Sequence, residues 1–278
     1  FLWEQASKDV IFENHLQPSV PVIAMKKSVC LSVLSKAFFC LYHRNSYDWK
    51  DFPSVNFDRL YVHSRGFDGR EKAKLQMILS YFVQLYQRHC DGTFVDEEIE
   101  FSLSESKNTW LEWQQEQSSL SVFSMEDMYK SLDDAKDDYR IDFANAYLGG
   151  ASLSYGSVQE EIMFSICPEM NVGRLFSPKM KEHQAICITG TEQFTLPVGY
   201  SHRLDFGGRY KDQSTVINDR RQSFVVAIDA LDFRGLPTSM QYTQDGILRE
   251  LNKSYAAMSV LQTPSTVATG NWGCGVFG

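Results

Sequence analysis

The sequence predicts an α/β protein in which a helical N-terminal region precedes an α/β region. In the first third of the chain, apolar residues recur at the spacing of amphipathic helices. From about Gly92 onward, short apolar runs rich in β-branched residues alternate with turn residues, which is typical of strands joined by loops. We therefore expect a helical region over residues 1–91 and an α/β region over residues 92–278.

Length and composition agree with this class. The 278 residues are 43% hydrophobic and 22% charged, which excludes disorder, collagen-like repeats and a coiled coil as the main state. A chain of this length corresponds to one large domain or about two ordinary ones. It buries a substantial core without metal or disulfide staples.

Two helices are predicted in the N-terminal region. Ser28 to Tyr42 carries a broad apolar stripe at helical spacing, and Glu71 to Arg88 repeats the pattern. Pro53, Gly66 and Gly69 mark the loops between them.

Three strands and a third helix are predicted in the second region. The strands are the apolar runs Ile141 to Ala144, Ala185 to Ile188 and Phe224 to Leu231. The last two are nearly continuous, as expected for strands buried on both faces. Val158 to Cys167 has the pattern of a helix, which Pro168 would end.

Charge and hydropathy exclude several functions. The net charge is −8, whereas nucleic-acid binders are normally basic because phosphate neutralisation dominates their affinity, so no direct DNA binding is expected. The longest apolar stretch, Val29 to Tyr42, is too short and too polar to cross a bilayer. We expect no signal peptide at the start of the chain. We expect a soluble, intracellular protein without a membrane partner.

Cysteine and histidine spacing predicts no metal site. The six cysteines include no CxxC pair, and the six histidines are scattered. Free thiols in a reducing compartment are the expected state.

The segment from Asp142 to Glu161 is the most informative for chemistry. A strand end leads through Gly149 and Gly150 to a helix start with Glu160 and Glu161. Glycines allow close approach to a ligand, and free N–H groups at a helix start suit phosphate. Paired carboxylates suit glycoside hydrolysis, which needs an acid and a second carboxylate. From the residues alone the structural interpretation has more weight, because two glutamates also complement a helix dipole.

A second glycine-rich segment closes the chain. Four glycines lie within residues 270–278, after a stretch rich in Ser and Thr. Its backbone amides could wrap a ligand, or the segment could be a flexible terminus.

The glycine turn, its short spacer and Gln159-Glu160-Glu161 resemble the signature of the poly(ADP-ribose) glycohydrolase family. Further blocks follow the family's order from about Val20 to the end, which makes nine in all. These blocks are Ala37-Phe38-Phe39-Cys40, Asn56-Phe57-Asp58-Arg59-Leu60, Asp142-Phe143-Ala144-Asn145, Thr189-Gly190-Thr191-Glu192-Gln193, Gly199-Tyr200, Val226-Ala227-Ile228-Asp229-Ala230, Arg249-Glu250-Leu251-Asn252-Lys253 and Ala268 to Gly275.

The resemblance implies a fold and an activity. The fold would be a macrodomain-like mixed sheet flanked by helices, with an N-terminal helical extension. The activity would be hydrolysis of ribose–ribose O-glycosidic bonds in poly(ADP-ribose), releasing ADP-ribose, without metal or cofactor. Poly(ADP-ribosyl)ated proteins would be partners, the location would be the nucleus, the cytoplasm or both, and the process would be the DNA damage response.

The resemblance also implies residue roles. Glu161 would protonate the leaving ribose oxygen and then act as base on water. Glu160 would hold the ribose hydroxyls, and Asp142 would orient the site. The substrate-binding positions would be Leu132 and Asp133 at the adenine edge, and Asn145 and Gln159 at the ribose and its loop. Gly149 and Gly150 would let the chain pass close to the terminal ribose and phosphates, and Tyr200 would contact the substrate. The diphosphate loop would be formed by Asn271, Trp272, Gly273, Cys274, Gly275 and Val276, with Phe277 beside it.

Three departures from the family pattern motivate an alternative. Ala151 stands where the family has a third glycine, and Phe194, Leu196 and Pro197 replace polar and tyrosine-rich residues. The chain stops at Gly278 inside the diphosphate motif, so part of the C-terminal region is expected to be missing. The alternative function is a catalytically impaired, ADP-ribose-binding macrodomain-like module.

The negative charge of the chain also bears on substrate binding. We expect the polyanion to be held by backbone amides and helix dipoles, with four cations contributing. These are Arg203, Arg209, Arg220 and Arg221, for which the alternative interpretation, a solvated hairpin, has more weight from the residues alone.

Overall fold

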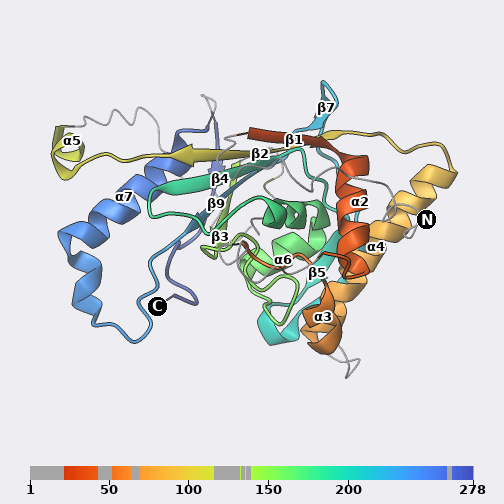
Figure 1. Cartoon of the computed structure of the whole chain (residues 1–278), viewed down its shortest axis with the longest axis horizontal. Coiled ribbons are helices and arrows are strands. Elements are labelled where there is room, and N and C mark those ends of the chain that lie inside the picture. The colour runs from red at the N-terminus through yellow and green to blue at the C-terminus, as the bar shows by residue number, and fades with distance from the viewer. Residues whose placement is uncertain are drawn as a thin grey trace.

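A mixed six-stranded sheet forms the centre of the computed structural model (Figure 1). The structure describes residues 22–42, 52–63, 69–115, 132, 135, 139–261 and 265–277. The spatial order of the strands is β1-β2-β4-β9-β3-β10. Their bounds are β1 Val22–Lys26, β2 Glu98–Glu105, β3 Tyr139–Ala144, β4 Gln184–Thr189, β9 Phe224–Asp229 and β10 Val267–Ala268.

Strand direction divides the sheet into two halves. The pairs β1–β2, β2–β4 and β4–β9 are antiparallel, whereas β9–β3 and β3–β10 are parallel. Strands β3 and β9 run in register from Tyr139 opposite Phe224 to Ala144 opposite Asp229. Because parallel strands end at the same edge of a sheet, the segments after β3, β9 and β10 emerge together.

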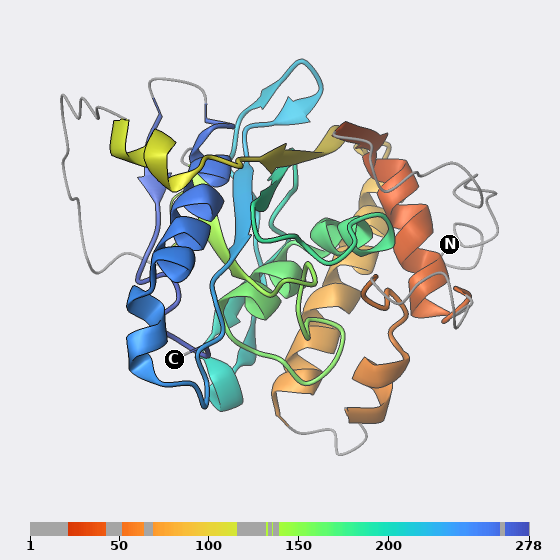
Figure 2. The ribbon, with the colours of Figure 1, turned by 60° about the vertical axis from the view of Figure 1, so that its left-hand side comes forward.

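Helices cover both faces of the sheet. One face carries α2 (Lys27–Phe38), α4 (Arg70–Cys90), α6 (Gln159–Ile166) and the 3-10 helix η3 (Pro168–Leu175), and α7 (Gln244–Met258) covers the other. Figure 2 shows this division, with α7 in blue on one side and the red-orange, light-orange and green helices on the other. The remaining elements are α3 Asp58–His63, α5 Trp110–Gln115, β5 Thr195–Val198, η4 Ser201–Arg203, β6 Asp205–Arg209, β7 Val216–Ile217, β8 Arg220–Arg221 and η5 Thr238–Tyr242.

Strand β9 shows why the sequence of a central strand is continuously apolar. Val225 and Ala227 belong to the larger core, beneath α2, α4 and α6, whereas Val226 and Ile228 belong to the core beneath α7. Successive side chains of a strand point to opposite faces, so a strand covered on both sides needs apolar residues at every position. The predicted burial of this strand on both faces is confirmed.

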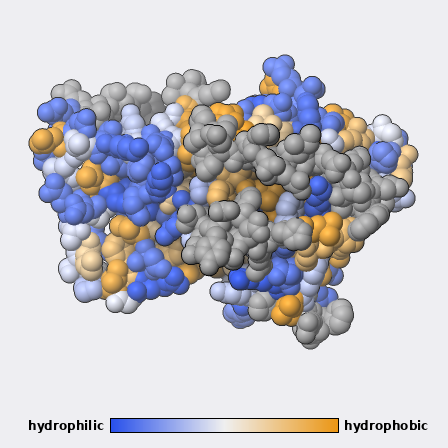
Figure 3. All heavy atoms as spheres, in the orientation of Figure 1, coloured by the Kyte–Doolittle hydropathy of each residue, from blue (hydrophilic) through white to orange (hydrophobic). Residues whose placement is uncertain are grey.

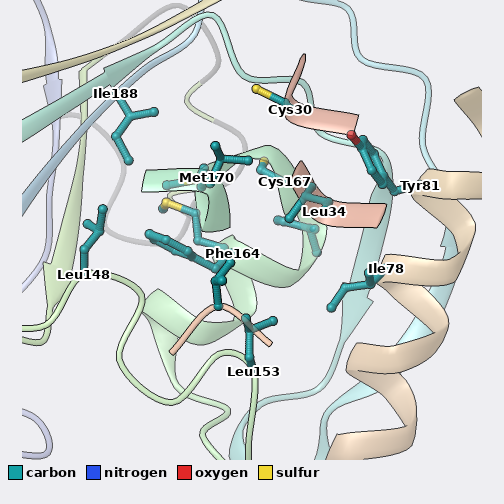
Figure 4. Close-up of a cluster of buried hydrophobic side chains, with 14 of the residues drawn as sticks. Cys30, Leu34, Ile78, Tyr81, Leu148, Leu153, Phe164, Cys167, Met170 and Ile188 are labelled. Carbon is teal, nitrogen blue, oxygen red and sulfur yellow. The ribbon is translucent and has the colours of Figure 1, made fainter. Parts of the chain in front are cut away.

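The larger core joins the N-terminal helices to the segment around α6 (Figure 4). Leu34 of α2 and Ile78 of α4 lie near Phe164 of α6, and Leu148 and Leu153 enter the same cluster from the loop before α6. Full burial of a side chain of this size contributes about 1.5–3 kcal/mol. The loop before α6 is therefore anchored in the core at both Leu148 and Leu153.

The predicted helices are confirmed, and Pro168 follows α6 and begins η3. The N-terminal region also contributes strand β1, which the helical interpretation of residues 1–91 omitted. This five-residue run pairs with β2, about 75 residues further along the chain, and local periodicity cannot reveal such a partner. The expected boundary at residue 91 falls just after α4, while the larger core draws residues from both sides of it.

On the face shown in Figure 3, hydrophobic residues are interspersed among hydrophilic ones, as on ordinary protein surfaces. No helix in the described ranges has the length and apolar character needed to span a membrane. All six cysteines are free thiols, as expected.

Candidate active site

Helix α6 begins against the end of β3, and Gln159 fixes this contact. Its side-chain oxygen accepts a hydrogen bond from the N–H of Phe143 at 2.9 Å, and its Nε2 donates to the carbonyl of Ile141 at 3.1 Å. The first residue of the helix thus binds two backbone groups of the strand. This contact sets the position of the two glutamates that follow.

Glu160 is buried and accepts two backbone hydrogen bonds. Its Oε1 accepts from Gly149 N at 2.7 Å, and its Oε2 accepts from Asn145 N at 2.9 Å. Burial raises the pKa of Glu160 well above its usual value, and the charges of Asp142 and Glu161 raise it further, whereas the two N–H donors act in the opposite direction. Glu160 therefore ties both arms of the preceding turn to the helix start.

Glu161 is held by two other backbone donors. Its Oε2 accepts from Val158 N at 2.9 Å, which is the third-residue arrangement of a helix capping box, and its Oε1 accepts from Ala151 N at 3.2 Å. Glu160 and Glu161 thus bind different parts of the loop. The carboxylate of Glu161 lies beside residues 151–156.

Asp142 completes a cluster of three acids. It lies on β3 with no solvent exposure, and neither carboxylate oxygen has a hydrogen-bond partner among the described residues. Burial raises the pKa of Asp142 well above its usual value, and the charge of Glu161 adds to the effect. Such unpartnered burial of a carboxyl is costly and typical of functional sites.

The two predicted glycines are required by geometry. Gly149 has φ +78° and Gly150 has φ +44°, a region that favours glycine. A Cβ on Gly149 would lie 2.9 Å from the Phe164 ring, and one on Gly150 would lie 2.6 Å from Oε2 of Glu160. Ala151 is not among the residues with positive φ, so the alanine at the third glycine position fits the backbone.

Two buried cations behind the loop were missed from the sequence. Arg174 of η3 donates from Nη1 to the carbonyls of Leu148 at 2.9 Å and Gly150 at 3.2 Å. Burial lowers the pKa of Arg174 to about 10, against the opposing charges of the two glutamates. Nζ of Lys74, on α4, lies within 3.2 Å of four further carbonyl oxygens of the loop, which share its three N–H donors. A lysine on the apolar side of a predicted helix is the signal that could have indicated Lys74.

Tyr200 lies beside the start of α6. It follows Gly199, whose φ is +73°, and the next residue, Ser201, donates its N–H to the carbonyl of Ser157 at 3.0 Å. Burial raises the pKa of Tyr200, a backbone hydrogen bond with Gln159 opposes this, and the charge of Glu161 adds to the rise. Tyr200 is 55% exposed as a residue, so it remains accessible to a ligand.

The C-terminal glycine-rich segment reaches the same sheet edge. Strand β10 runs parallel to β3 and leads into residues 270–277, where Trp272 Nε1 donates to the carbonyl of Ile228 at 3.2 Å. A Cβ on Gly270 would lie 3.3 Å from the ring of Phe143. The predicted diphosphate residues therefore lie at the carboxyl ends of β3 and β9.

The remaining expectations have different outcomes. Leu132 is described and accepts a hydrogen bond from Ala135 N at 3.3 Å, whereas Asp133 lies outside the described residues.

The expectation that Arg220 and Arg221 serve the substrate is wrong. Arg220 pairs with Glu98 and Glu100, and Arg221 pairs with Glu97 at 2.8 Å, near the start of β9 and thus at the opposite end from the acids.

The two other arginines lie elsewhere on the chain. Arg209 binds Gln87 of α4 at 2.7 Å, and Arg203 belongs to η4, next to Tyr200.

Within the described ranges, no group of three or more His, Cys, Asp or Glu side chains has the arrangement of a metal site.

Comparison with known proteins identifies the family. Residues 110–278 match the macro-domain-fold part of poly(ADP-ribose) glycohydrolase, and residues 10–102 match its helical domain. The chain belongs to the poly(ADP-ribose) glycohydrolase family. The mixed sheet covered by helices is accordingly the macro domain fold, as the resemblance implied.

Named relatives in this family come from plants and nematodes. Poly(ADP-ribose) glycohydrolase 1 of Arabidopsis thaliana is 32% identical over 238 residues, which is 84% of this chain and 42% of the relative. Probable poly(ADP-ribose) glycohydrolase 2 of the same plant is 28% identical, over 92% of this chain and 58% of the relative. Poly(ADP-ribose) glycohydrolase 1 of Caenorhabditis elegans is 34% identical, over 73% of this chain and 27% of the relative. The matched part of the chain thus spans between 27% and 58% of the length of these relatives.

Proposed function

We propose that this chain hydrolyses the ribose–ribose O-glycosidic bonds of poly(ADP-ribose) and releases ADP-ribose. The cluster of three acids at the start of α6 carries the proposal. Asp142, Glu160 and Glu161 come together beneath a glycine turn, and glycoside hydrolysis needs paired carboxyl groups of this kind. Family membership and the names of the relatives support the same reaction.

Glu161 is the proposed general acid. It is 7% exposed, whereas Glu160 is 2% and Asp142 is 0% exposed, so Glu161 is the member that a bound ribose reaches most easily. It donates a proton to the leaving ribose oxygen as the glycosidic bond breaks, and charge develops on the remaining ribose as an oxocarbenium-like centre. The resulting carboxylate then takes a proton from the attacking water, which restores the acid.

The other two acids support this cycle. The raised pKa values of Asp142 and Glu160 keep protons within the cluster at pH values at which exposed carboxyls are ionised. Glu160, fixed by two backbone donors, holds the ribose hydroxyls, and Asp142 orients the cluster from β3.

Substrate binding in this proposal depends on backbone amides more than on side-chain cations. The segments after β3 and β10 present glycines at the carboxyl ends of parallel strands, where ligands bind in open α/β sheets. Tyr200 contributes its exposed ring to the ribose side, and residues 271–277 contribute the diphosphate loop. This arrangement explains how an acidic chain holds a polyanion.

The partners are then poly(ADP-ribose), ADP-ribose and poly(ADP-ribosyl)ated proteins. We place the activity in the nucleus, the cytoplasm or both, within the DNA damage response. The alternative of an impaired binding module rested partly on Ala151. That residue fits the backbone, and its N–H binds Glu161 at 3.2 Å, so it preserves the acid cluster.

Release of ADP-ribose from purified poly(ADP-ribose) tests the proposal. The wild-type chain is compared with Glu161→Gln and with the control Glu112→Gln, an exposed position on α5 at the far end of the molecule from α6 (Figure 1). We expect release by the wild type and the control, and a loss on the order of 100- to 10,000-fold in Glu161→Gln. ADP-ribose binding without turnover by the wild type would instead establish the binding module.

A further inference from the structure

Lys74 gathers four carbonyl groups of the loop that surrounds the acids. Its Nζ lies 3.2 Å from the carbonyl oxygen of Ala151, 2.9 Å from that of Ser152, and 2.5 Å from those of Ser154 and Gly156. The side chain has no solvent exposure. The four carbonyl oxygens surround the ammonium group in the way that oxygen ligands surround a bound metal ion.

The opposite side of this segment contacts the proposed acid. The N–H of Ala151 donates to Oε1 of Glu161 at 3.2 Å, while the space beside Gly156 is filled by the same carboxyl group. The segment 151–156 therefore contacts Lys74 through its carbonyl groups on one side and Glu161 on the other. The contacts with Lys74 hold the loop in place beside Glu161. Leu153 secures the middle of the loop in the core (Figure 4).

The charges around Lys74 come from three elements. Glu161 of α6 and Arg174 of η3 face it from outside its helix, and Arg70 and Glu71 neighbour it on α4. Burial lowers the pKa of Lys74 to about 7, and the charge of Glu161 opposes that shift. The four carbonyl dipoles also favour the ammonium form, because hydrogen bonds to a charged group stabilise it.

We propose that Lys74 is a positioning residue that holds residues 151–156 around the carboxyl group of Glu161. The inference rests on the proposed glycohydrolase function. It also assigns a role to the helical domain, because Lys74 lies in the part of the chain that matches that domain, whereas the acids lie in the macro-domain part. The helical region thus completes the active site of the macro domain through one side chain.

An ammonium group suits this role better than a guanidinium group. Its donors can rotate to follow carbonyls that approach from several directions, whereas the donors of arginine lie in one plane. We therefore expect Lys74→Arg to keep the buried charge but to misplace the loop. Lys74→Met keeps the length of the side chain and removes every donor, which leaves the four carbonyls without this cation.

The experiment compares Lys74→Met, Lys74→Arg and the control Lys72→Met, an exposed lysine on the same helix. Two quantities are measured for each folded protein. One is the kcat and KM for ADP-ribose release, and the other is hydrogen exchange of the amides in residues 149–157. We expect Lys74→Met to lower kcat by about 10- to 100-fold, with KM changed less than about threefold, and to speed amide exchange in the loop. Lys74→Arg should lie between, and Lys72→Met should match the wild type.

Unchanged kcat and unchanged loop exchange in Lys74→Met would overturn the inference while leaving the proposed function intact. If Lys74→Met does not fold, Lys74→Arg decides, and wild-type kcat with wild-type exchange in that variant would overturn it. If the wild-type chain releases no ADP-ribose, the proposed function fails. Hydrogen exchange then still tests the loop, since unchanged exchange in both Lys74 variants would refute the positioning role.

Discussion

Gly156 leaves space that the side chain of Glu161 occupies. A Cβ on Gly156 would lie 2.6 Å from Cδ of Glu161 and 2.7 Å from Cβ of Ala151. Gly156 is not among the residues with positive φ, so lack of space, and not a left-handed backbone, is what requires a glycine there. The loop therefore closes on the proposed acid at a distance that no side chain on residue 156 permits.

Gly156→Ala should reduce activity more than stability. The added methyl group forces the carboxyl group of Glu161 or the Ala151 segment to move, and a displacement of about 1 Å costs on the order of 100-fold in rate. The control Gly246→Ala, at the start of α7, meets nothing nearer than 3.1 Å. ADP-ribose release by both variants is the measurement, and equal rates would show that Glu161 tolerates displacement.

Asp142→Asn should flatten the pH dependence of stability. The pKa of Asp142 is raised in the folded state, so the folded protein binds more protons than the unfolded chain above the ordinary pKa. The free energy of unfolding therefore falls as pH rises, by at most about 1.4 kcal/mol per pH unit for this group.

Urea unfolding of wild type and Asp142→Asn from pH 4 to pH 8 measures the effect. We expect a smaller slope in the variant and a loss of ADP-ribose release. Glu160 and Glu169, whose pKa values are also raised by burial, contribute to the remaining slope with the same sign. Identical slopes in the two proteins would contradict the unpartnered burial of Asp142.

Lys27→Met should strongly destabilise the protein. The ammonium group lies 2.6 Å from Glu192, 3.0 Å from Glu97 and 3.8 Å from Glu169, and all four side chains are buried. Removing the cation leaves Glu169 without an ion-pair partner among the described residues, and leaves Glu97 and Glu192 to Arg88 and Arg221, at a cost of about 3–5 kcal/mol. Guanidinium unfolding beside the less buried Lys36→Met measures the difference, and a loss below 1 kcal/mol would show that the carboxylates find other partners.

Tyr200→Ala should affect substrate binding and leave the fold intact. Tyr200 is 55% exposed, so the removal of its side chain changes the free energy of unfolding by less than about 0.5 kcal/mol. Loss of a ring that packs on the ligand should raise KM by about tenfold. The second variant Tyr200→Phe separates the ring from the hydroxyl group. An unchanged KM in Tyr200→Ala would remove Tyr200 from the binding site.

The sequence alone determined the elements with strong local patterns. The two N-terminal helices and helix α6 follow from apolar spacing, and β4 and β9 follow from runs that are apolar at every position. The glycine turn and the paired glutamates were also recognisable from the sequence. Gly149 and Gly150 have positive φ angles, which residues with a side chain rarely adopt. These features depend on residues that are close together in the sequence, so they can be predicted from the local sequence.

Only the tertiary structure decided the features that join distant residues. Strand β1 pairs with β2, and Lys74 reaches residues 151–156, which lie about 80 positions further along the chain. The structure also assigned Arg220 and Arg221 to partners on and beside β2 instead of the substrate. Each of these contacts joins polar groups that are far apart in the sequence. A buried polar group needs a partner, and only the folded structure shows which distant group provides it.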